Sequence, residues 1–359
     1  MLKYAFKVKF ELQTVSQVYD AAHRALGRVP FFRILRVAKG GRLSDAVLEL
    51  SDGERSWSIL ADFLVRPEPK FLREKAARLK EEASLRGSDW QVLLVGEYFS
   101  NEAAAICREL DVSYADVAGN CYLHFGKVFV QVEGRPNPSP SKRGLKSLFA
   151  SSAQRVLRVL LTDSKKAWKV TDLSQAADVS WGTVSNVRRK LIDQEWAEDA
   201  QEGLRVTKPE VLLDEWAKVD RWEKRTEVRQ YSLLATDPKE IALEASWFLK
   251  KGEHAFTQWF AGWLRHPYTV PPVVSVYVKD FPDETELEKH SGARRVTDGG
   301  RLWLVKPKDE GVFWPSQTVG GFTLVSDVQI YLDLLRAGLR GDEQAKQLRA
   351  AKDFGIGKE

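Results

Sequence analysis

Between residues 151 and 209 the apolar positions follow the spacing of three short amphipathic helices and a hairpin. The first helix is expected to start at the Ser151–Ser152 pair, because serine hydroxyls accept hydrogen bonds from unpaired N–H groups at a helix start. Thr171 is expected to cap the second helix, and Ser180 a third helix from Trp181 to Gln194. The inward positions predicted for the three helices are Val156, Leu157, Leu160, Leu161, Leu173, Ala176, Ala177, Val184, Val187 and Leu191.

A hairpin follows these helices, with its tip at residues 201–203 and its return strand at residues 204–208. This order of elements is typical of a winged helix-turn-helix, whose third helix enters the DNA major groove. On the third helix Ser185 and Asn186 are placed for base edges, while the basic side chains suit phosphates. Trp181 would pack on the sugar-phosphate edge or seal the turn. The residues predicted to contact DNA are Trp181, Thr183, Ser185, Asn186, Arg188, Arg189, Lys190, Arg205 and Lys208.

The charge distribution favours the same interpretation. From Ser141 to Lys208 there are 13 basic and 8 acidic residues, a net charge of +5. The whole chain has 55 basic and 50 acidic residues, also +5, so the basic excess lies in this one segment. Such an excess is typical of phosphate binding, which releases condensed counterions. The alternative is a winged helix that docks another protein.

Residues 1 to 135 alternate strand-like and helix-like patterns, which predicts an α/β layer fold. The helix over 70–85 is expected to bury Phe71, Ala76, Leu79 and Ala83. A Ser100 cap is expected to open another helix. The predicted helices are Gln17–Leu26, Lys70–Leu85 and Asn101–Leu110, and the predicted strands are Phe31–Val37, Ala46–Leu50, Trp57–Val65, Val92–Val95, Cys121–Phe125 and Val128–Val132.

The clearest linker is Gly134 to Gly144, where three alternating prolines prevent both helix and sheet. Lys142, Arg143 and Lys146 then lead into the winged helix, and they suit either solubility or phosphate contact. The sequence therefore predicts an α/β multidomain protein. Its parts are a nuclease-like α/β domain (1–135), a proline-rich linker (136–146), a winged helix-turn-helix (147–209) and an α/β domain with leading helices (210–359).

In the last domain the patterns again mix helices with strands. Ser326 is expected to cap the closing helix, the Asp309–Glu310 pair to lie in a solvated turn, and residues 338–359 to fray. One long helix or a pair of helices is predicted at Pro209–Tyr231. Further helices are predicted at Lys239–Lys251, His254–His266, Pro282–His290 and Val325–Leu335, and a strand at Val273–Val278.

One block resembles a known family. Gly96–Ser100 precedes an apolar helix, and Val112–Asn120 then contains the pattern Tyr-x-Asp-x-Ala-Gly-Asn. This block and the closing helix at Val325–Leu335 resemble AbiEi-type antitoxins, transcriptional regulators of prokaryotic type IV toxin-antitoxin systems. The resemblance implies a partner gene for a nucleotidyltransferase-like toxin.

Within the block, Asp116, Gly119 and Asn120 could line a pocket. The interpretation that we favour is a turn, in which Gly119 takes a positive φ and Asp116 accepts backbone N–H groups.

The N-terminal domain also resembles the PD-(D/E)xK nuclease fold, in which two acids hold a metal ion and a lysine activates water. Asp45 and Asp62 could be these acids, with Glu49 as a further carboxylate. Leu64 stands where the lysine is expected, so the resemblance implies a degenerate centre.

The rest of the composition excludes several classes of protein. The contents of 43% hydrophobic and 29% charged residues are ordinary for a globular protein. Cys107 and Cys121 form no metal or disulfide framework, and the five histidines lack ligand spacing. No phosphate loop, catalytic constellation or membrane-spanning run is present.

The leading hypothesis is a cytoplasmic, non-enzymatic DNA-binding repressor of the antitoxin type without metal or cofactor. Its expected partner is double-stranded DNA, and a toxin and a homodimer stay open. The alternatives are a metal-dependent nuclease and a non-catalytic interaction module.

Overall fold

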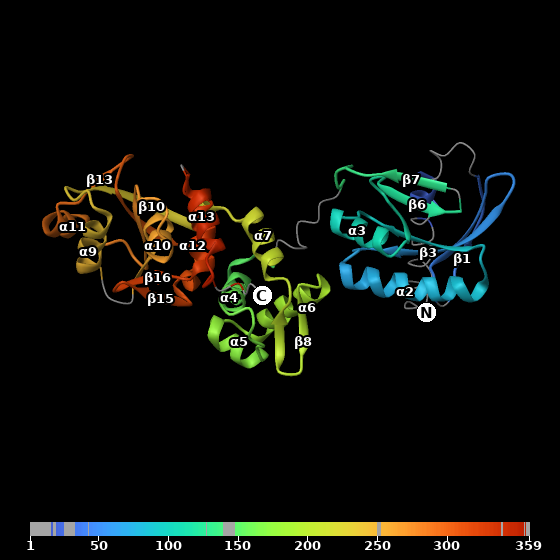
Figure 1. The fold of residues 1–359 in the computed structure, drawn as a ribbon, viewed down its shortest axis with the longest axis horizontal. Helices are drawn as coiled ribbons and strands as arrows, with labels where there is room; N and C mark the ends of the chain where they lie inside the picture. The colour runs from blue at the N-terminus through green and yellow to red at the C-terminus, as the bar shows by residue number, and fades with distance from the viewer. Residues whose placement is uncertain are drawn as a thin grey trace, which may run out of the picture. The chain divides into compact units, whose positions relative to one another are not determined.

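The computed structural model describes residues 16, 19–24, 33–41, 43–126, 128–138, 148–249, 253–338, 340–354 and 356. The chain divides into two compact units, residues 1–141 and 142–359. Each unit combines helices with a mixed sheet, so the predicted α/β class is confirmed (Figure 1).

The first unit is built on a seven-stranded sheet whose strands follow chain order. The central pairs β3–β4 and β4–β5 are parallel, and the other neighbours are antiparallel. Each parallel connection contains a helix, because parallel strands require a long crossover. The elements are β1 (Arg33–Lys39), β2 (Ala46–Ser51), β3 (Ser56–Leu64), α2 (Pro69–Arg86), β4 (Trp90–Gly96), α3 (Asn101–Glu109), β5 (Ser113–Asp116), β6 (Cys121–Phe125) and β7 (Val128–Val132).

Helices α2 and α3 cover one face of this sheet. Ala76, Leu79 and Ala83 of α2 are buried as predicted. The prediction for Phe71 is wrong, because its side chain is 44% exposed and Leu72 is buried instead. A step of one residue turns a helical side chain by about 100°, so only one of two adjacent apolar residues can face the sheet.

The first turn of α3 and the hairpin after it agree with the sequence predictions. The hydroxyl of Ser100 accepts a hydrogen bond from the N–H of Ala103 at 3.2 Å, which confirms the predicted cap. β6 and β7 pair as an antiparallel hairpin. Within the predicted helix over 17–26, residues 19–24 are helical. Residues 17, 18, 25 and 26 lie outside the described residues.

The second unit begins with three helices and a hairpin (Figure 1): α4 (Ser151–Thr162), α5 (Val170–Ala177), α6 (Trp181–Asp193), β8 (Ala197–Ala200) and β9 (Gly203–Val206). Ser180 caps α6 as predicted, accepting from the N–H of Thr183 at 3.3 Å. The inward positions predicted for the three helices are buried except Ala176, which is exposed.

Two predicted caps are wrong. The N-cap of α4 is Ala150, so Ser151 and Ser152 lie within the first turn. The N-cap of α5 is Lys169, and the Thr171 hydroxyl instead donates to Asp172 at 2.9 Å. Neither helix start has a side-chain cap, because packing of the buried stripe against the core stabilises these helices without one.

The chain after the hairpin turns from helix to strand earlier than predicted. α7 (Pro209–Val219) and α8 (Trp222–Arg225) are helical, but β10 (Thr226–Ser232) is a strand of the second sheet. The predicted helix over 254–266 is likewise divided into β11 (His254–Thr257) and α10 (Gln258–Arg265). Gln258 has φ 49°, which separates strand from helix.

The second sheet has the strand order β13-β10-β14-β12-β11-β16-β15. Its central strand β12 is buried at every position, as expected for a strand covered on both faces. The further elements are α9 (Pro238–Phe248), β12 (Val274–Val278), α11 (Glu284–Ser291), β13 (Arg294–Val296), β14 (Leu302–Pro307), η2 (Glu310–Phe313), β15 (Ser316–Val319), β16 (Phe322–Val325), α12 (Asp327–Leu334) and α13 (Gly341–Ala350).

The described residues of the C-terminal segment, 338, 340–354 and 356, include a packed helix where we expected fraying. Leu348, Phe354 and Ile356 are buried, and Arg349 of α13 pairs with Glu210 and Asp214 of α7. Ser326 caps α12 as predicted. One continuous hydrophobic core includes residues of α4–α6, the second sheet and α13, so the three helices and the C-terminal region are packed together.

Candidate nucleic-acid interface

Helix α6 is held by one buried stripe and presents the opposite side to solvent. Val184, Val187 and Leu191 lie in the core at i, i+3 and i+7. The side chain of Trp181 is 64% exposed, although large aromatic residues are usually buried. Ser185, Asn186 and Arg189 are also exposed, as their positions between the buried residues require. The solvent side of α6 therefore carries one exposed aromatic ring, two small polar side chains and a cation.

The turn between α5 and α6 is fixed by hydrogen bonds. Asp178 adopts the left-handed conformation, φ 49°, and the hydroxyl of Ser174 donates to the carbonyl of Val179 at 2.6 Å. The Nη1 of Arg155 on α4 donates to the carbonyl oxygen of Asp178 at 3.2 Å. The Nε of Arg155 also donates to Asp309 Oδ1 at 3.0 Å, and this bond raises the Arg155 pKa. Asp309 thus anchors the turn and is not the solvated acid that we expected.

Two of the predicted DNA contacts are ion-paired within the unit. Arg188 Nε lies 2.7 Å from Asp199 Oδ1 and Arg188 Nη2 lies 2.5 Å from Asp199 Oδ2. Arg205 Nε lies 3.0 Å from Glu198 Oε1, and this hydrogen bond raises the pKa of Arg205. Both carboxylates belong to β8, so the hairpin supplies acids to the basic residues around it.

The other predicted contact residues differ in accessibility. Lys208 is exposed, whereas Thr183 and Lys190 are half-buried. The hydroxyl of Thr183 lies 3.1 Å from that of Ser180, so it belongs to the helix cap. Lys142, Arg143 and Lys146 lie outside the described residues.

Trp168 pairs with the hairpin in the position of a third strand, which the sequence patterns did not indicate. Trp168 and Leu204 exchange two backbone hydrogen bonds of 2.8 and 2.9 Å. Gly203 has φ +136°, and a Cβ there would lie 2.4 Å from the Trp168 carbonyl oxygen, so only glycine fits this approach. The exposed residues Lys165, Lys166 and Lys169 flank Trp168 and are thus placed beside the hairpin. Their basic character was visible in the sequence, but their position depends on this pairing.

In the first unit Asp45, which immediately precedes β2, lies beside Asp62 of β3. The N–H of Asp45 donates to the Ala61 carbonyl at 3.0 Å, and Asp45 Oδ2 accepts from the N–H of Phe63 at 2.9 Å. Glu49 does not join them, because it lies four residues along β2, opposite Ser58. Four residues of a strand span about 13 Å. The set of three carboxylates considered for a metal is therefore not assembled.

Asp62 has a partner that the sequence did not reveal. Lys75 of α2 forms an ion pair with its buried carboxylate, so a lysine is present near the acids, although it comes from a helix and not from position 64. Burial, then the hydrogen bond with Asp45, raises the pKa of Asp62 to about 7, while Lys75 lowers it. Among the described residues, no group of three or more His, Cys, Asp or Glu side chains could hold a metal ion.

Asp116 and Asn120 have the structural role that we favoured. Asp116 Oδ2 accepts from the N–H of Phe99 at 3.1 Å, and Asp116 Oδ1 from the N–H of Asn120 at 2.8 Å. Gly119 has φ +88°. The Asp-x-Ala-Gly-Asn pattern thus forms a turn in which the buried Asp116 carboxylate accepts hydrogen bonds from backbone N–H groups.

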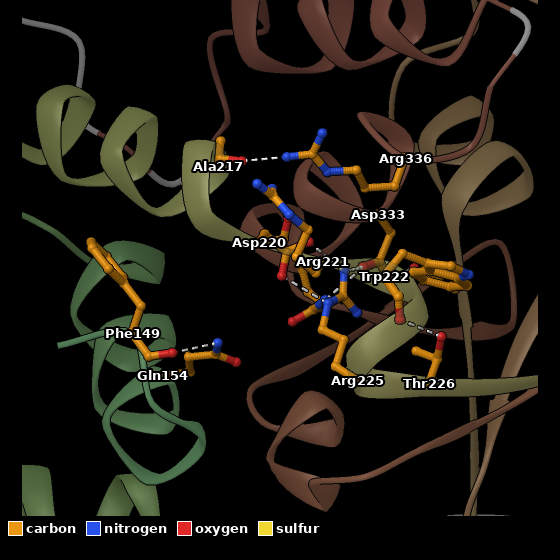
Figure 2. A network of polar contacts seen from close by, with 12 residues as sticks. Phe149, Gln154, Ala217, Asp220, Arg221, Trp222, Arg225, Thr226, Asp333 and Arg336 are labelled. Carbon is orange, nitrogen blue, oxygen red and sulfur yellow. Dashed lines mark hydrogen bonds and ion pairs between the residues drawn. The ribbon is translucent and has the colours of Figure 1, made fainter. Parts of the chain in front are cut away.

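A buried polar network lies in the second unit. Figure 2 shows Arg225 at the end of α8 reaching Asp220 and Asp333, with Trp222 beside it. The Nη1 of Arg225 donates to the Tyr277 hydroxyl at 2.7 Å. Gln329 Nε2 donates to Asp333 Oδ1 at 2.7 Å, and its Oε1 accepts from Arg158 Nε at 2.7 Å. The network thereby connects α4 with α8 and α12.

Arg158 is the member of this network whose buried positive charge is the least stabilised by its neighbours. Its side chain is buried, its Nη1 has no hydrogen-bond partner in the described part of the chain, and burial lowers its pKa to about 10. We expect Arg158→Met to lower the free energy of unfolding by less than about 1 kcal/mol, or to raise it, because the substitution removes the cost of burying a cation together with its hydrogen bond to Gln329. Urea unfolding measures the change, and a loss greater than about 3 kcal/mol would show that the cation is needed.

Comparison with known proteins relates the C-terminal region to one family. Residues 205–352 match the family model described as a transcriptional regulator, AbiEi antitoxin, of a type IV toxin-antitoxin system. The match supports the AbiEi-type resemblance over β9 to α13, which is fewer than half of the chain's 359 residues. No curated protein and no solved structure matches the chain. None of the helices in the described part of the chain is long and apolar enough to cross a membrane.

Proposed function

We propose that this protein is a non-enzymatic, cytoplasmic transcriptional regulator of the antitoxin type, which binds DNA through a winged helix-turn-helix formed by α4–α6 and β8–β9. The observation that carries the proposal is the solvent side of α6, where Trp181, Ser185, Asn186 and Arg189 are exposed opposite a fully buried stripe. The match to a family of transcriptional regulators supports the same function.

The roles follow from the positions on α6. Ser185 and Asn186 lie near the front of the helix and are proposed to read base edges, where an asparagine can bind adenine with two hydrogen bonds. Trp181 at the first position is proposed to pack on the sugar-phosphate edge. The proposed phosphate contacts are Arg188, Arg189, Lys190, Arg205 and Lys208. Arg188 and Arg205 would have to exchange their carboxylate partners for phosphates.

The proposed partners are double-stranded DNA and, by the family resemblance, a nucleotidyltransferase-like toxin encoded nearby. A gel shift with the DNA upstream of the protein's own gene, in a salt series with random-sequence competitor, tests the DNA-binding function. Retention that survives the competitor is expected. No retention even at low salt would show that α4–α6 serve another purpose, such as docking a protein.

Two of the exposed polar positions on α6, Asn186 and Arg189, should respond differently to substitution. Asn186→Ala is expected to reduce discrimination between specific and random DNA by about 1–3 kcal/mol, because it removes a base contact. Arg189→Ala is expected to weaken binding to all sequences and to reduce the salt slope by about 1. Binding measured on both DNAs across the salt series gives both quantities. Arg294→Ala, on β13, is the control and should leave both unchanged.

A further inference from the structure

The hairpin that would form the wing carries the wrong charge for a phosphate contact. Residues 197–206 contain three acidic residues, Glu198, Asp199 and Glu202, and one basic residue, Arg205. All four are exposed. Carboxylates near the DNA backbone are repelled by the phosphates, so the acidic side of the hairpin is unsuited to a close approach.

Two of these acidic residues form ion pairs with nearby basic residues. Asp199 binds the guanidinium of Arg188 through two hydrogen bonds of 2.7 and 2.5 Å. Glu198 binds Arg205 from the opposite position on the paired strand. Each pair cancels one positive charge, and the double contact of Arg188 holds its guanidinium toward β8.

The segment on the other edge of the hairpin has the opposite character. Lys165, Lys166 and Lys169 are exposed, and none of them forms an ion pair with a carboxylate among the described residues. The ammonium of Lys166 lies 3.7 Å from the centre of the Trp168 ring. The backbone bonds between Trp168 and Leu204 fix this segment beside β9. Three cations without an ion-paired carboxylate among the described residues are thus placed beside β9 by the backbone bonds of Trp168.

We propose that Lys165, Lys166 and Lys169 form the phosphate-binding edge of the DNA interface, and that Glu198 and Asp199 restrain Arg188 and Arg205 from contacting DNA. This inference rests on the proposed DNA-binding function and, within it, replaces the phosphate contacts of Arg188 and Arg205 by contacts of the three lysines. The ligand of the three lysines is the sugar-phosphate backbone of duplex DNA, whereas α6 contacts the base edges.

The test uses the full chain and a random-sequence DNA duplex across a salt series. The triple variant Lys165→Ala, Lys166→Ala, Lys169→Ala is expected to bind about 10- to 100-fold more weakly, with a salt slope reduced by about 2–3. The matched control replaces three exposed lysines on other elements, Lys224, Lys289 and Lys352, and removes the same net charge. The control should leave the salt slope unchanged.

The complementary variant Glu198→Gln, Asp199→Asn is expected to bind several-fold more tightly, because two repelling charges are lost and two arginines are released. If the wild type binds but the lysine variant behaves like the control, while Arg205→Ala and Arg188→Ala lose affinity, this inference is wrong and the proposed function stands. If the wild type fails to bind at low salt, both are wrong.

Discussion

Arg225→Met is expected to lower the free energy of unfolding of the second unit by about 3–5 kcal/mol, because it leaves buried carboxylates without their cation. Arg225 Nη2 lies 2.6 Å from Asp333 Oδ1, and Arg225 Nε lies 2.8 Å from Asp220 Oδ1. Burial disfavours the charged form, but Tyr277, Asp333 and Asp220 together raise the pKa of Arg225 above its ordinary value. The cation is therefore stabilised in the fold, in contrast to Arg158.

Urea unfolding at neutral pH measures this loss from the transition midpoint and slope. Arg294→Met is the matched control, since the Arg294 side chain is 78% exposed and pairs with Glu288 at the surface. Exposed pairs contribute about 0–1 kcal/mol, so the control should barely shift the midpoint. Equal losses in the two variants would mean that the buried network contributes no more than a surface pair.

Lys75→Met is expected to destabilise the first unit by about 1 kcal/mol near pH 8 and by much less near pH 5, because Asp62 ionises only near pH 7 and can take up a proton when its cation is lost. The pKa of Asp62 rises from 3.8 to about 7 on folding, mainly through burial, so the folded state binds a proton that the unfolded state releases. Stability from this group is therefore present below pH 4 and is lost as the pH rises to about 7. Lys75 lowers the pKa of Asp62, and its removal leaves a buried, unpaired carboxylate at high pH.

Hydrogen exchange of β3 and α2, followed by mass spectrometry at several pH values, reports on this unit alone. Asp62→Asn is the control, because an amide cannot titrate and the pH dependence from this site should disappear. A Lys75→Met variant whose loss is the same at pH 5 and pH 8 would separate the effect of Lys75 from the ionisation of Asp62.

The local pattern determined the elements that form the candidate DNA interface. The spacing of Val184, Val187 and Leu191 defined α6, because a helix stripe depends only on neighbours within two turns. The caps at Ser100, Ser180 and Ser326 were found for the same reason. The exposed faces follow directly from the buried ones.

Only the tertiary structure decided which charges meet. Asp62 and Lys75 are 13 residues apart, and Arg188 and Asp199 are 11 apart, on different elements, so no periodicity relates them. The strand at His254–Thr257 also depended on distant partners, because a buried run of four residues fits a helix or a strand equally well until a neighbouring strand pairs with it. The sequence by itself determined the presence of helices α4–α6, the hairpin after them and the location of the basic excess. Contacts between elements decided which cations are compensated, because Coulomb interactions depend on distance in space and not along the chain.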